Sequence, residues 1–409
     1  MARKVTTLRG KYNEAKVFTH NLCDKASSQI VDYLDQDFSA GEKIRIMPDV
    51  HAGKGSVIGF TQTFSDKAVP NIVGVDIACG MLTVDLEDHD FSLEKLDAII
   101  RRYIPSGHAT LNQEKDFYLL KKLKCYDELQ NKSRIYKSIG TLGGGNHFIE
   151  VNYSEKTKFK LLVVHSGSRN LGTQVAKHHQ DIAEGLHSNT KNYQADVERV
   201  IKDLKGKKKQ KDIDKAIKKI RNRYKGASRY PKDLCYLYGS YLDDYLHDME
   251  ITQKYATLNR EEMINTILRH LLGAKLDDFY HFETLHNYID LENKIIRKGA
   301  ISARKGEKVL IPLNMRDGSL IAIGKGNEDW NYSAPHGAGR LYSRAEAMRK
   351  ISLKDFQYQM KDVYSTSVRA STLDEAPQVY KPAEEIIGLI SDTVEIIEQI
   401  KPLYNFKAS

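Results

Sequence analysis

The chain has 409 residues, of which 41% are hydrophobic and 29% are charged, and its formal net charge is +9. This size allows a large core, while the lack of any run of about 18 apolar residues argues against a membrane span. The opening stretch MARKVTTLRGKYNEAKVF has no apolar h-region, so no signal peptide is expected. Four scattered cysteines favour a reducing, cytoplasmic location over a disulfide framework.

Apolar runs and turn residues predict the elements along the chain. Short strands and tight loops are predicted over 44–85, helices over 93–104 and 115–130, and a buried strand over 159–165 that ends at a histidine. The chain then becomes helical and polar from about 173 to 275. Strands return at 294–302, 308–312 and 319–323. The last third is expected to be helical, with an amphipathic helix over 382–400 that has proline at its start.

The helical segment interrupts a series of histidine motifs that continues on both sides of it. We therefore predict a mixed α/β (α+β) fold that forms one composite domain over 1–409, with a helical, basic insertion over 175–275. Residues 201–230 contain thirteen Lys or Arg and three Asp, a net charge of +10. This segment is therefore more positive than the chain as a whole, whose net charge is +9. An apolar stripe of Ile213, Ile217, Ile220 and Tyr224 runs along it at helical spacing. The segment is either an arm that contacts RNA or DNA phosphates or a solvated helix face.

Five histidines occur in short motifs, mostly beside Gly, Ser or Asn: His51, His147, His165, His286 and His336. A lone histidine is usually an ordinary polar residue, but five such motifs together with Asp76 and Cys79 of GVDIACGM indicate a transition-metal site. No CxxC pair exists, which argues against a closed structural zinc site. The mixed oxygen, nitrogen and sulfur donors suit Mn²⁺, Zn²⁺ or Co²⁺.

Glycine-rich loops are a second signal. GTLGGGNHFIEV begins at Gly140 and places four glycines within six residues, which lets backbone approach a ligand closely. Neither the GxxxxGK[ST] nor the GxGxxG fingerprint is present. Three further loops, GKGS, GSR and GAGR, place Lys54, Arg169 and Arg340 beside candidate ligands. Tight turns with solvated charges are the plain interpretation of each loop, and a polyphosphate or nucleic-acid site is the interpretation of the set.

Taken together, the motifs resemble those of the RtcB family of RNA-splicing and RNA-repair ligases. From about residue 44 to the end of the chain they appear in the family's order: MPDVHAGKGSVIG, VGVDIACGM, GTLGGGNHFIE, HSGSRNLG, HNY, RKGAISAR and HGAGRLYSR. The resemblance implies strands and Gly-rich loops around a dinuclear metal site. It also implies a GTP- and Mn²⁺-dependent ligase that joins an RNA 3′-phosphate or 2′,3′-cyclic phosphate end to a 5′-hydroxyl end, in tRNA splicing or RNA repair.

The resemblance assigns residues to roles. Asp76, Cys79 and His147 would hold one Mn²⁺, and Cys79 would bridge to a second that His165 and His286 complete. His336 would be the nucleophile that takes GMP from GTP, with Asp49 and His51 as supporting residues near the metals. The guanylate site would be lined by Asn146, Glu150, Asn287, Ala338, Gly339, Arg340, Tyr380 and Lys407. The expected partners are RNA, as cleaved tRNA halves or damaged RNA, and an archease-like activator, with no membrane.

One loop departs from the family pattern. The family usually has Pro-Gly-Ser-Met-Gly where this chain has PLNMRDG over residues 312–318. The change bears on nucleotide geometry and preference, and Arg316 is a candidate replacement for lost phosphate contacts. Two rival functions follow: a metal-dependent 2′,3′-cyclic phosphodiesterase, against which the retained His336 argues, and a non-catalytic RNA-end-binding protein, against which the complete ligand set argues.

Overall fold

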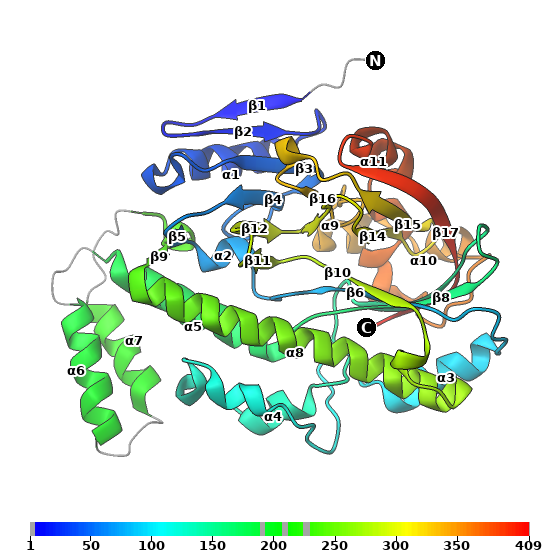
Figure 1. The fold of residues 1–409 in the computed structure, drawn as a ribbon, viewed down its shortest axis with the longest axis horizontal. Coiled ribbons are helices and arrows are strands. Elements are labelled where there is room, and N and C mark those ends of the chain that lie inside the picture. The colour runs from blue at the N-terminus through cyan, green and yellow to red at the C-terminus, as the bar shows by residue number, and fades with distance from the viewer. Residues whose placement is uncertain (1–4, 189–192, 207–211, 224–229, 409) are drawn as a thin grey trace.

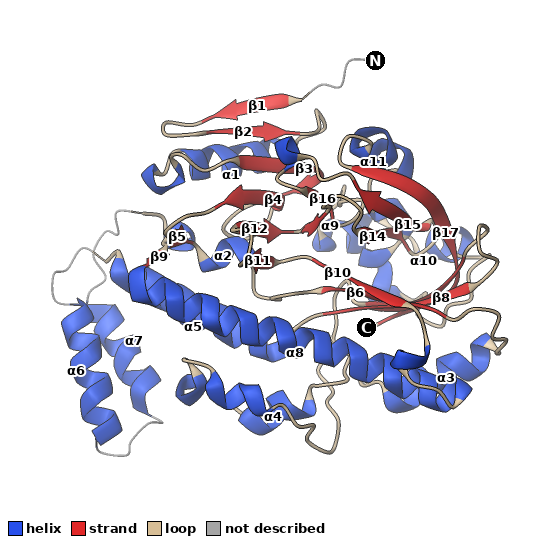
Figure 2. Cartoon of the chain, viewed as in Figure 1, coloured by secondary structure: helices blue, strands red, loops and turns tan. Residues whose placement is uncertain are grey.

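The computed structural model describes residues 5–188, 193–206, 212–223 and 230–408. It has the mixed α/β fold that the sequence predicts, and this fold is built on two larger sheets (Figure 2). Among the described residues, no helix combines the length and the apolar character needed to cross a bilayer.

The first sheet has six strands in the order β1-β2-β3-β4-β12-β11. Most of its pairs are antiparallel, while β2 and β3 run parallel. The strand bounds are β1 Thr6–Arg9, β2 Glu14–Val17, β3 Ile44–His51, β4 Ile58–Thr63, β11 Tyr288–Asp290 and β12 Ile295–Lys298. Apolar side chains of this sheet share one core with five helices: α1 (Asp24–Leu34), α2 (Pro70–Val73), the short α4 (Lys132–Lys137), α5 (Arg169–Leu186) and the 34-residue α8 (Gly239–Leu272).

The second sheet has seven antiparallel strands in the order β10-β6-β8-β7-β17-β15-β14. Their bounds are β6 Gly80–Asp85, β7 Phe148–Tyr153, β8 Lys160–Ser166, β10 His281–Leu285, β14 Lys308–Asn314, β15 Gly318–Gly324 and β17 Val394–Lys407. The sheet curls until its edge strands meet, since the Leu310 N–H of β14 donates to the Thr284 hydroxyl of β10 at 3.0 Å.

Successive side chains of β7 point alternately to the two faces of the curled sheet. Ile149 and Val151 pack in one core with α3 (Leu93–Tyr103) and the C-terminal half of α8. Phe148 and Glu150 lie on the other face, toward a small inner core that holds Met81, Val163, Leu310 and Ile321. A period of two therefore places one row of residues against the helices and the next row inside the curl.

The remaining short elements lie around these sheets. They are β5 Lys67–Ala68, β9 Leu237–Tyr238, β13 Ala300–Ser302, β16 Ser333–Pro335, α9 Arg344–Lys350, α10 Leu353–Gln359 and α11 Ala383–Ile390. Strand β13 pairs with β16, and β5 pairs with β9.

Two predicted helices are wrong. Residues 115–130 form only short 3₁₀ turns at Tyr118–Lys122 and Tyr126–Glu128, because the backbone N–H groups of Lys124 and Cys125 donate to the distant Asp248 carboxylate. The predicted helix over 382–400 ends at Ile390, and β17 follows it. The turn at residues 391–393 stops the helix, and the β-branched residues beyond it pair with β15 and then with β7. The last third is therefore a mixture of strands and short helices.

The helical character of 173–275 is confirmed for the residues described there, apart from the short strand β9. In Figure 1, α5 and α8 lie along the sheets, while α6 (Tyr193–Gly206) and α7 (Ile213–Arg223) form a pair at one end of the molecule. Ile213 and Ile220 of the apolar stripe are buried. Tyr224 and the lysines Lys207, Lys208, Lys209, Lys211 and Lys225 lie outside the described residues, and the insertion bounds of 175–275 stay a prediction.

Candidate active site

The five expected metal ligands meet at one end of four neighbouring strands. Asp76 and Cys79 precede β6, His147 precedes β7, His165 lies near the end of β8, and His286 follows β10. Because these strands are antiparallel in the order β10-β6-β8-β7, the start of one lies beside the end of the next. The register places Gly80 opposite Leu285 and His165 opposite both Met81 and Phe148.

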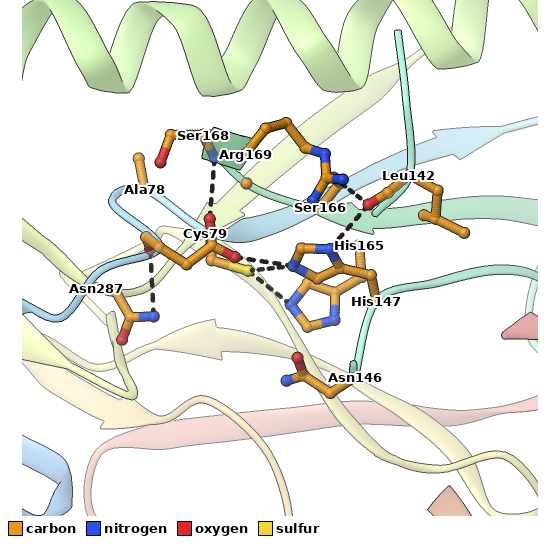
Figure 3. Close-up of polar contacts among 12 residues, drawn as sticks. Ala78, Cys79, Leu142, Asn146, His147, His165, Ser166, Ser168, Arg169 and Asn287 are labelled. Atoms are coloured by element: carbon orange, nitrogen blue, oxygen red, sulfur yellow. Dashed lines mark hydrogen bonds and ion pairs between the residues drawn. The ribbon is translucent and has the colours of Figure 1, made fainter. Parts of the chain in front are cut away.

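Cys79 lies between two groups of ligand atoms, and Figure 3 shows its contacts with one histidine of each group. Its Sγ lies 3.3 Å from His147 Nε2 and 3.2 Å from His165 Nε2. His147 Nε2 is also 2.9 Å from Asp76 Oδ2, and His165 Nε2 is 3.4 Å from His286 Nε2. Within each group, Asp76-Cys79-His147 and Cys79-His165-His286, the ligand atoms lie within 4.8 Å of one another.

Burial and neighbouring groups shift the pKa values of four of these ligands, His165, His286, Cys79 and Asp76. Burial, followed by the neighbouring histidines, lowers the pKa of His165 and of His286 well below the ordinary value, so both rings are neutral near pH 7. Burial, followed by the charge of Asp76, raises the pKa of the Cys79 thiol. Burial alone would raise the pKa of Asp76, but hydrogen bonding and charge from His147 lower it to about 2. Neutral imidazoles and an ionised carboxylate are ready donors, and a bound cation would favour the thiolate.

The backbone around the ligands is strained. Ala78 and Asn287, which adjoin Cys79 and His286, adopt positive φ values of 52° and 59°. The Ala78 N–H donates to the Asn287 carbonyl and the His286 N–H donates to the Cys79 carbonyl, so the two segments lock each other. Left-handed residues other than glycine are costly and concentrate at functional sites.

The glycine-rich loop at 140–147 is held from two sides. The Asn259 side chain of α8 accepts hydrogen bonds from the N–H groups of Gly140 and Thr141 at 2.8 and 3.0 Å. Gly143 has φ of 86°, and a Cβ there would lie 1.8 Å from Arg169 Nη1. The loop carbonyl of Leu142 accepts from His147 Nδ1 at 2.8 Å, which turns Nε2 toward Asp76 and Cys79. The glycines thus give Arg169 room to approach.

His336 lies beside the ligands with one nitrogen already engaged. Its Nδ1 is 2.6 Å from Oδ2 of the fully buried Asp49, and its backbone N–H donates to the same oxygen at 3.1 Å. A carboxylate only accepts, so Nδ1 is the donor in this contact and Nε2 is the ring nitrogen left for a substrate. The His336 ring lies 4.9 Å from that of His286. His51 Nδ1 donates to the Asp49 carbonyl at 2.9 Å, and burial lowers the pKa of His51 to about 4.

A pocket of about 850 Å³ opens over His336 and Cys79. All eight residues expected around a guanylate line it: Asn146, Glu150, Asn287, Ala338, Gly339, Arg340, Tyr380 and Lys407. Burial raises the pKa of Glu150 to about 7, although Asn152 and Asn405 hydrogen-bond to its carboxylate. Gly339 is required at its position, because a Cβ there would lie 2.5 Å from the Asp49 carbonyl oxygen.

Three expected residues converge on one carboxylate that the sequence analysis missed. Buried Glu375 contacts Lys407 Nζ at 2.8 Å, the Tyr380 hydroxyl at 2.6 Å and Arg340 Nη1 at 3.2 Å. Burial opposes ionisation of Glu375, but Lys407, Tyr380 and Arg340 together lower its pKa. Lys407 Nζ also donates to the Asn146 carbonyl at 3.1 Å, which ties β17 to the glycine-rich loop.

The altered loop forms the turn between β14 and β15. Pro312, Leu313, Asn314, Met315 and Gly318 line the pocket. Arg316 is not among the lining residues; its guanidinium forms an ion pair with Asp317 at 2.7 Å and contacts Gln359. This pairing leaves the proposed phosphate contact of Arg316 without support.

Comparison with known proteins agrees with this arrangement. The model of the family described as tRNA-splicing ligase RtcB matches residues 38–131 and 116–408. The RNA-splicing ligase RtcB of Escherichia coli K12 is 30% identical over 402 residues, which cover 88% of each chain. The chain belongs to the RtcB family. The tRNA-splicing ligases RtcB of Archaeoglobus fulgidus and Nanoarchaeum equitans are 25% and 24% identical, over 88% of this chain and 86% of their own.

Other residues that organise this RtcB-family site carry no local sequence signal. Arg260 of α8 is fully buried, donates to the carbonyls of Ala78 and Ser166, and pairs with Glu283 at 2.7 Å. Lys298 is also buried and donates to the carbonyls of Lys54, Ser56 and Asn71, which fixes the GKGS loop. Only a polar residue inside an apolar helix face, as in LNREEM, could have drawn attention to Asn259 and Arg260.

Proposed function

We propose that the chain is a GTP- and Mn²⁺-dependent RNA ligase that joins 3′-phosphate or 2′,3′-cyclic phosphate ends to 5′-hydroxyl ends. The observation that carries the proposal is the placement of His336. Its Nδ1 is bound to buried Asp49, so Nε2 is the nitrogen available to a substrate in the pocket beside the Cys79 ligand groups.

The donor set supports two metal ions. Asp76, Cys79 and His147 would hold one, and Cys79, His165 and His286 the other, which fits the mutual approach of their ligand atoms. These donors alone suit several divalent metals, and manganese is proposed on the family resemblance. When bound, the cations would neutralise charge that builds on phosphate oxygens during transfer.

His336 would act first. Its Nε2 forms a bond to the α-phosphorus of GTP, the bond from that phosphorus to the β-phosphate oxygen breaks, and pyrophosphate leaves. Asp49 holds the Nδ1 proton and offsets the positive charge on the ring. Lys407, Arg340 and Glu375 would hold the guanylate side of the pocket in place, and Asn146 would contact its phosphate.

RNA would enter as the second substrate. The guanylate moves from His336 to an oxygen of the RNA 3′-phosphate, after water has opened any cyclic end. The 5′-hydroxyl oxygen then attacks the 3′-phosphorus, loses its proton, and GMP leaves as the phosphodiester forms. Cleaved tRNA halves or damaged RNA are the proposed substrates, and an archease-like protein is a proposed activator, tested by its effect on turnover number.

The decisive experiment is adduct formation without RNA. Incubation with Mn²⁺ and GTP labelled at the α-phosphate should give an acid-labile adduct that peptide mapping places on His336. His336→Ala should lose the adduct and all ligation, whereas His281→Ala, an exposed histidine on β10, should keep both. A parent protein that forms no adduct, or forms it on another residue, contradicts the proposal.

A further inference from the structure

A second group of metal-ligating side chains lies apart from the candidate active site. Cys125 lies between the two 3₁₀ turns of residues 118–128, hereafter the 3₁₀ segment, while His179 is on α5 and Asp248 is on α8. All three residues are at most 1% exposed. One ligand atom from each lies within 4.8 Å of the other two. None of the three lines the large pocket.

Asp248 is the centre of this group. Its Oδ2 lies 2.9 Å from His179 Nε2 and accepts the Cys125 N–H at 3.1 Å, while Oδ1 accepts the Lys124 N–H at 2.6 Å. Burial, followed by the charge of this carboxylate, raises the pKa of the Cys125 thiol. The carboxylate therefore fixes the irregular segment to two long helices.

Hydrogen bonding leaves part of the group unsatisfied. His179 Nδ1 and the hydroxyl of Tyr245 are buried and have no partner among the described residues. The centroids of the two rings lie 5.1 Å apart. Because His179 Nε2 is the nitrogen that faces Asp248, these two atoms lie outside the ligand set, and a buried water is what would satisfy them.

We propose that Cys125, His179 and Asp248 bind a zinc ion that ties the 3₁₀ segment to α5 and α8. Thiolate, imidazole and carboxylate are the common protein ligands of Zn²⁺. A cavity of about 340 Å³, which Cys125, His178 and Lys218 help to line, gives the ion a route from the surface.

The geometry needs only a small adjustment. Ligand atoms about 2.0–2.3 Å from a tetrahedral zinc lie roughly 3.3–3.7 Å from one another. The 2.9 Å contact between His179 and Asp248 would thus open by about half an ångström. Binding releases the thiol proton, because zinc holds the thiolate.

The test uses Co²⁺ as a coloured substitute for zinc in the full-length chain. A thiolate bound to Co²⁺ gives a near-ultraviolet charge-transfer band, and Cys79→Ala removes the thiolate of the candidate active site. We expect Cys79→Ala to show a band that saturates at one Co²⁺ per chain and disappears when Zn²⁺ is added. Adding Cys125→Ser should abolish it, while adding Cys235→Ser, another buried cysteine, should not.

A second variant separates metal binding from folding. In His179→Gln the amide can still donate to Asp248, so circular dichroism should show a folded chain. Its Zn²⁺ affinity, measured by competition against Co²⁺, should fall by more than about 100-fold, since loss of even an indirect partner costs 10–100-fold. The proposal is overturned if Cys79→Ala gives no band, if Cys125→Ser leaves the band unchanged, or if His179→Gln binds as tightly as its parent. A structural hydrogen-bond network alone would give the first of these results.

Discussion

Cys79 is the one residue shared by both ligand groups of the candidate active site. Its sulfur contacts His147 on one side and His165 on the other, at 3.3 and 3.2 Å. Asp76 and His286 each belong to only one group. A change at the sulfur is therefore not equivalent to a change at either flanking ligand.

We expect Cys79→Ala to weaken both Mn²⁺ sites, whereas His286→Ala weakens mainly one of them. Calorimetric titration with Mn²⁺ should show two events in the parent and one in His286→Ala. In Cys79→Ala, neither event should occur with the parent affinity. Cys235→Ser is the control, because this buried cysteine lies outside both groups. Two unaltered binding events in Cys79→Ala would disprove a shared sulfur ligand.

At the scale of elements, α8 is the scaffold that connects the two clusters of polar residues. Asp248 and Asn259 are eleven residues apart, or three turns, and so they share one face of the helix. Asp248 holds the 3₁₀ segment, and Asn259 holds the glycine-rich loop that carries His147. The buried face of α8 therefore holds the backbone of these two segments in place, in addition to packing in the hydrophobic core.

Asn259→Ala should lower the free energy of unfolding by about 1–3 kcal/mol, because the N–H groups of Gly140 and Thr141 lose their buried acceptor. The loop also positions His147, so Mn²⁺ affinity should fall as well. Denaturant titration measures the first effect and calorimetry the second. Lys254→Ala, at an exposed position of the same helix, should change neither. Equal stability of Asn259→Ala and the parent would show that water replaces the amide.

Local patterns predicted those elements that local forces determine. The helix at Leu93–Tyr103 has a Ser92 cap and an apolar stripe, and the strand at Lys160–Ser166 is a continuous apolar run. Residues 115–130 have a helical pattern as well, but Asp248, which is 123 and 124 residues away, accepts hydrogen bonds from two of their backbone N–H groups. Residues 394–407 become a strand because β7 and β15 provide edges for it. Such long-range contacts have no signal in a sequence window.

In the candidate site, too, local motifs predicted some residues, while residues that act through long-range contacts were missed. Histidine and cysteine motifs indicated a metal centre, and the family resemblance divided its ligands into the two groups that the structure brings together. Glu375, Asn259 and Arg260 escaped notice, because each acts through partners that lie far away in sequence. The role of Glu375 in the pocket follows only from its contacts with Lys407 and Arg340, which the sequence does not show.

At the scale of the whole molecule, positive charge is concentrated away from the candidate active site. Lys215, Lys218 and Lys219 of α7 are exposed, while Ile213 and Ile220 are buried. In Figure 1 the α6–α7 pair lies at one end of the molecule, apart from the strands that carry the metal ligands. Ile213 and Ile220 thus pack as the solvated-face interpretation requires, while the exposed lysines are accessible to a long RNA.

Replacing Lys215, Lys218 and Lys219 with Gln should reduce the slope of log RNA affinity against log salt by up to about two units, since each phosphate contact contributes roughly 0.7. Formation of the GMP adduct needs no RNA and should be unchanged. The control is the same change at Lys156, Lys158 and Lys401, at the opposite end of β7 from His147. If the slope of log RNA affinity against log salt is unchanged, α7 is a solvated helix face that does not contact RNA.

Strand β17 has a consequence for how the protein folds. Its first half pairs with β15 and its second half with β7, where Lys407 lies opposite Phe148, some 259 positions earlier. Closing so long a loop costs chain entropy before any contact repays it, so we infer slow folding through partly formed states. The positions of the metal ligands and of the pocket walls depend on this late pairing of β17. A variant that weakens β17 would therefore accumulate as an aggregation-prone intermediate instead of as a native enzyme with one damaged residue.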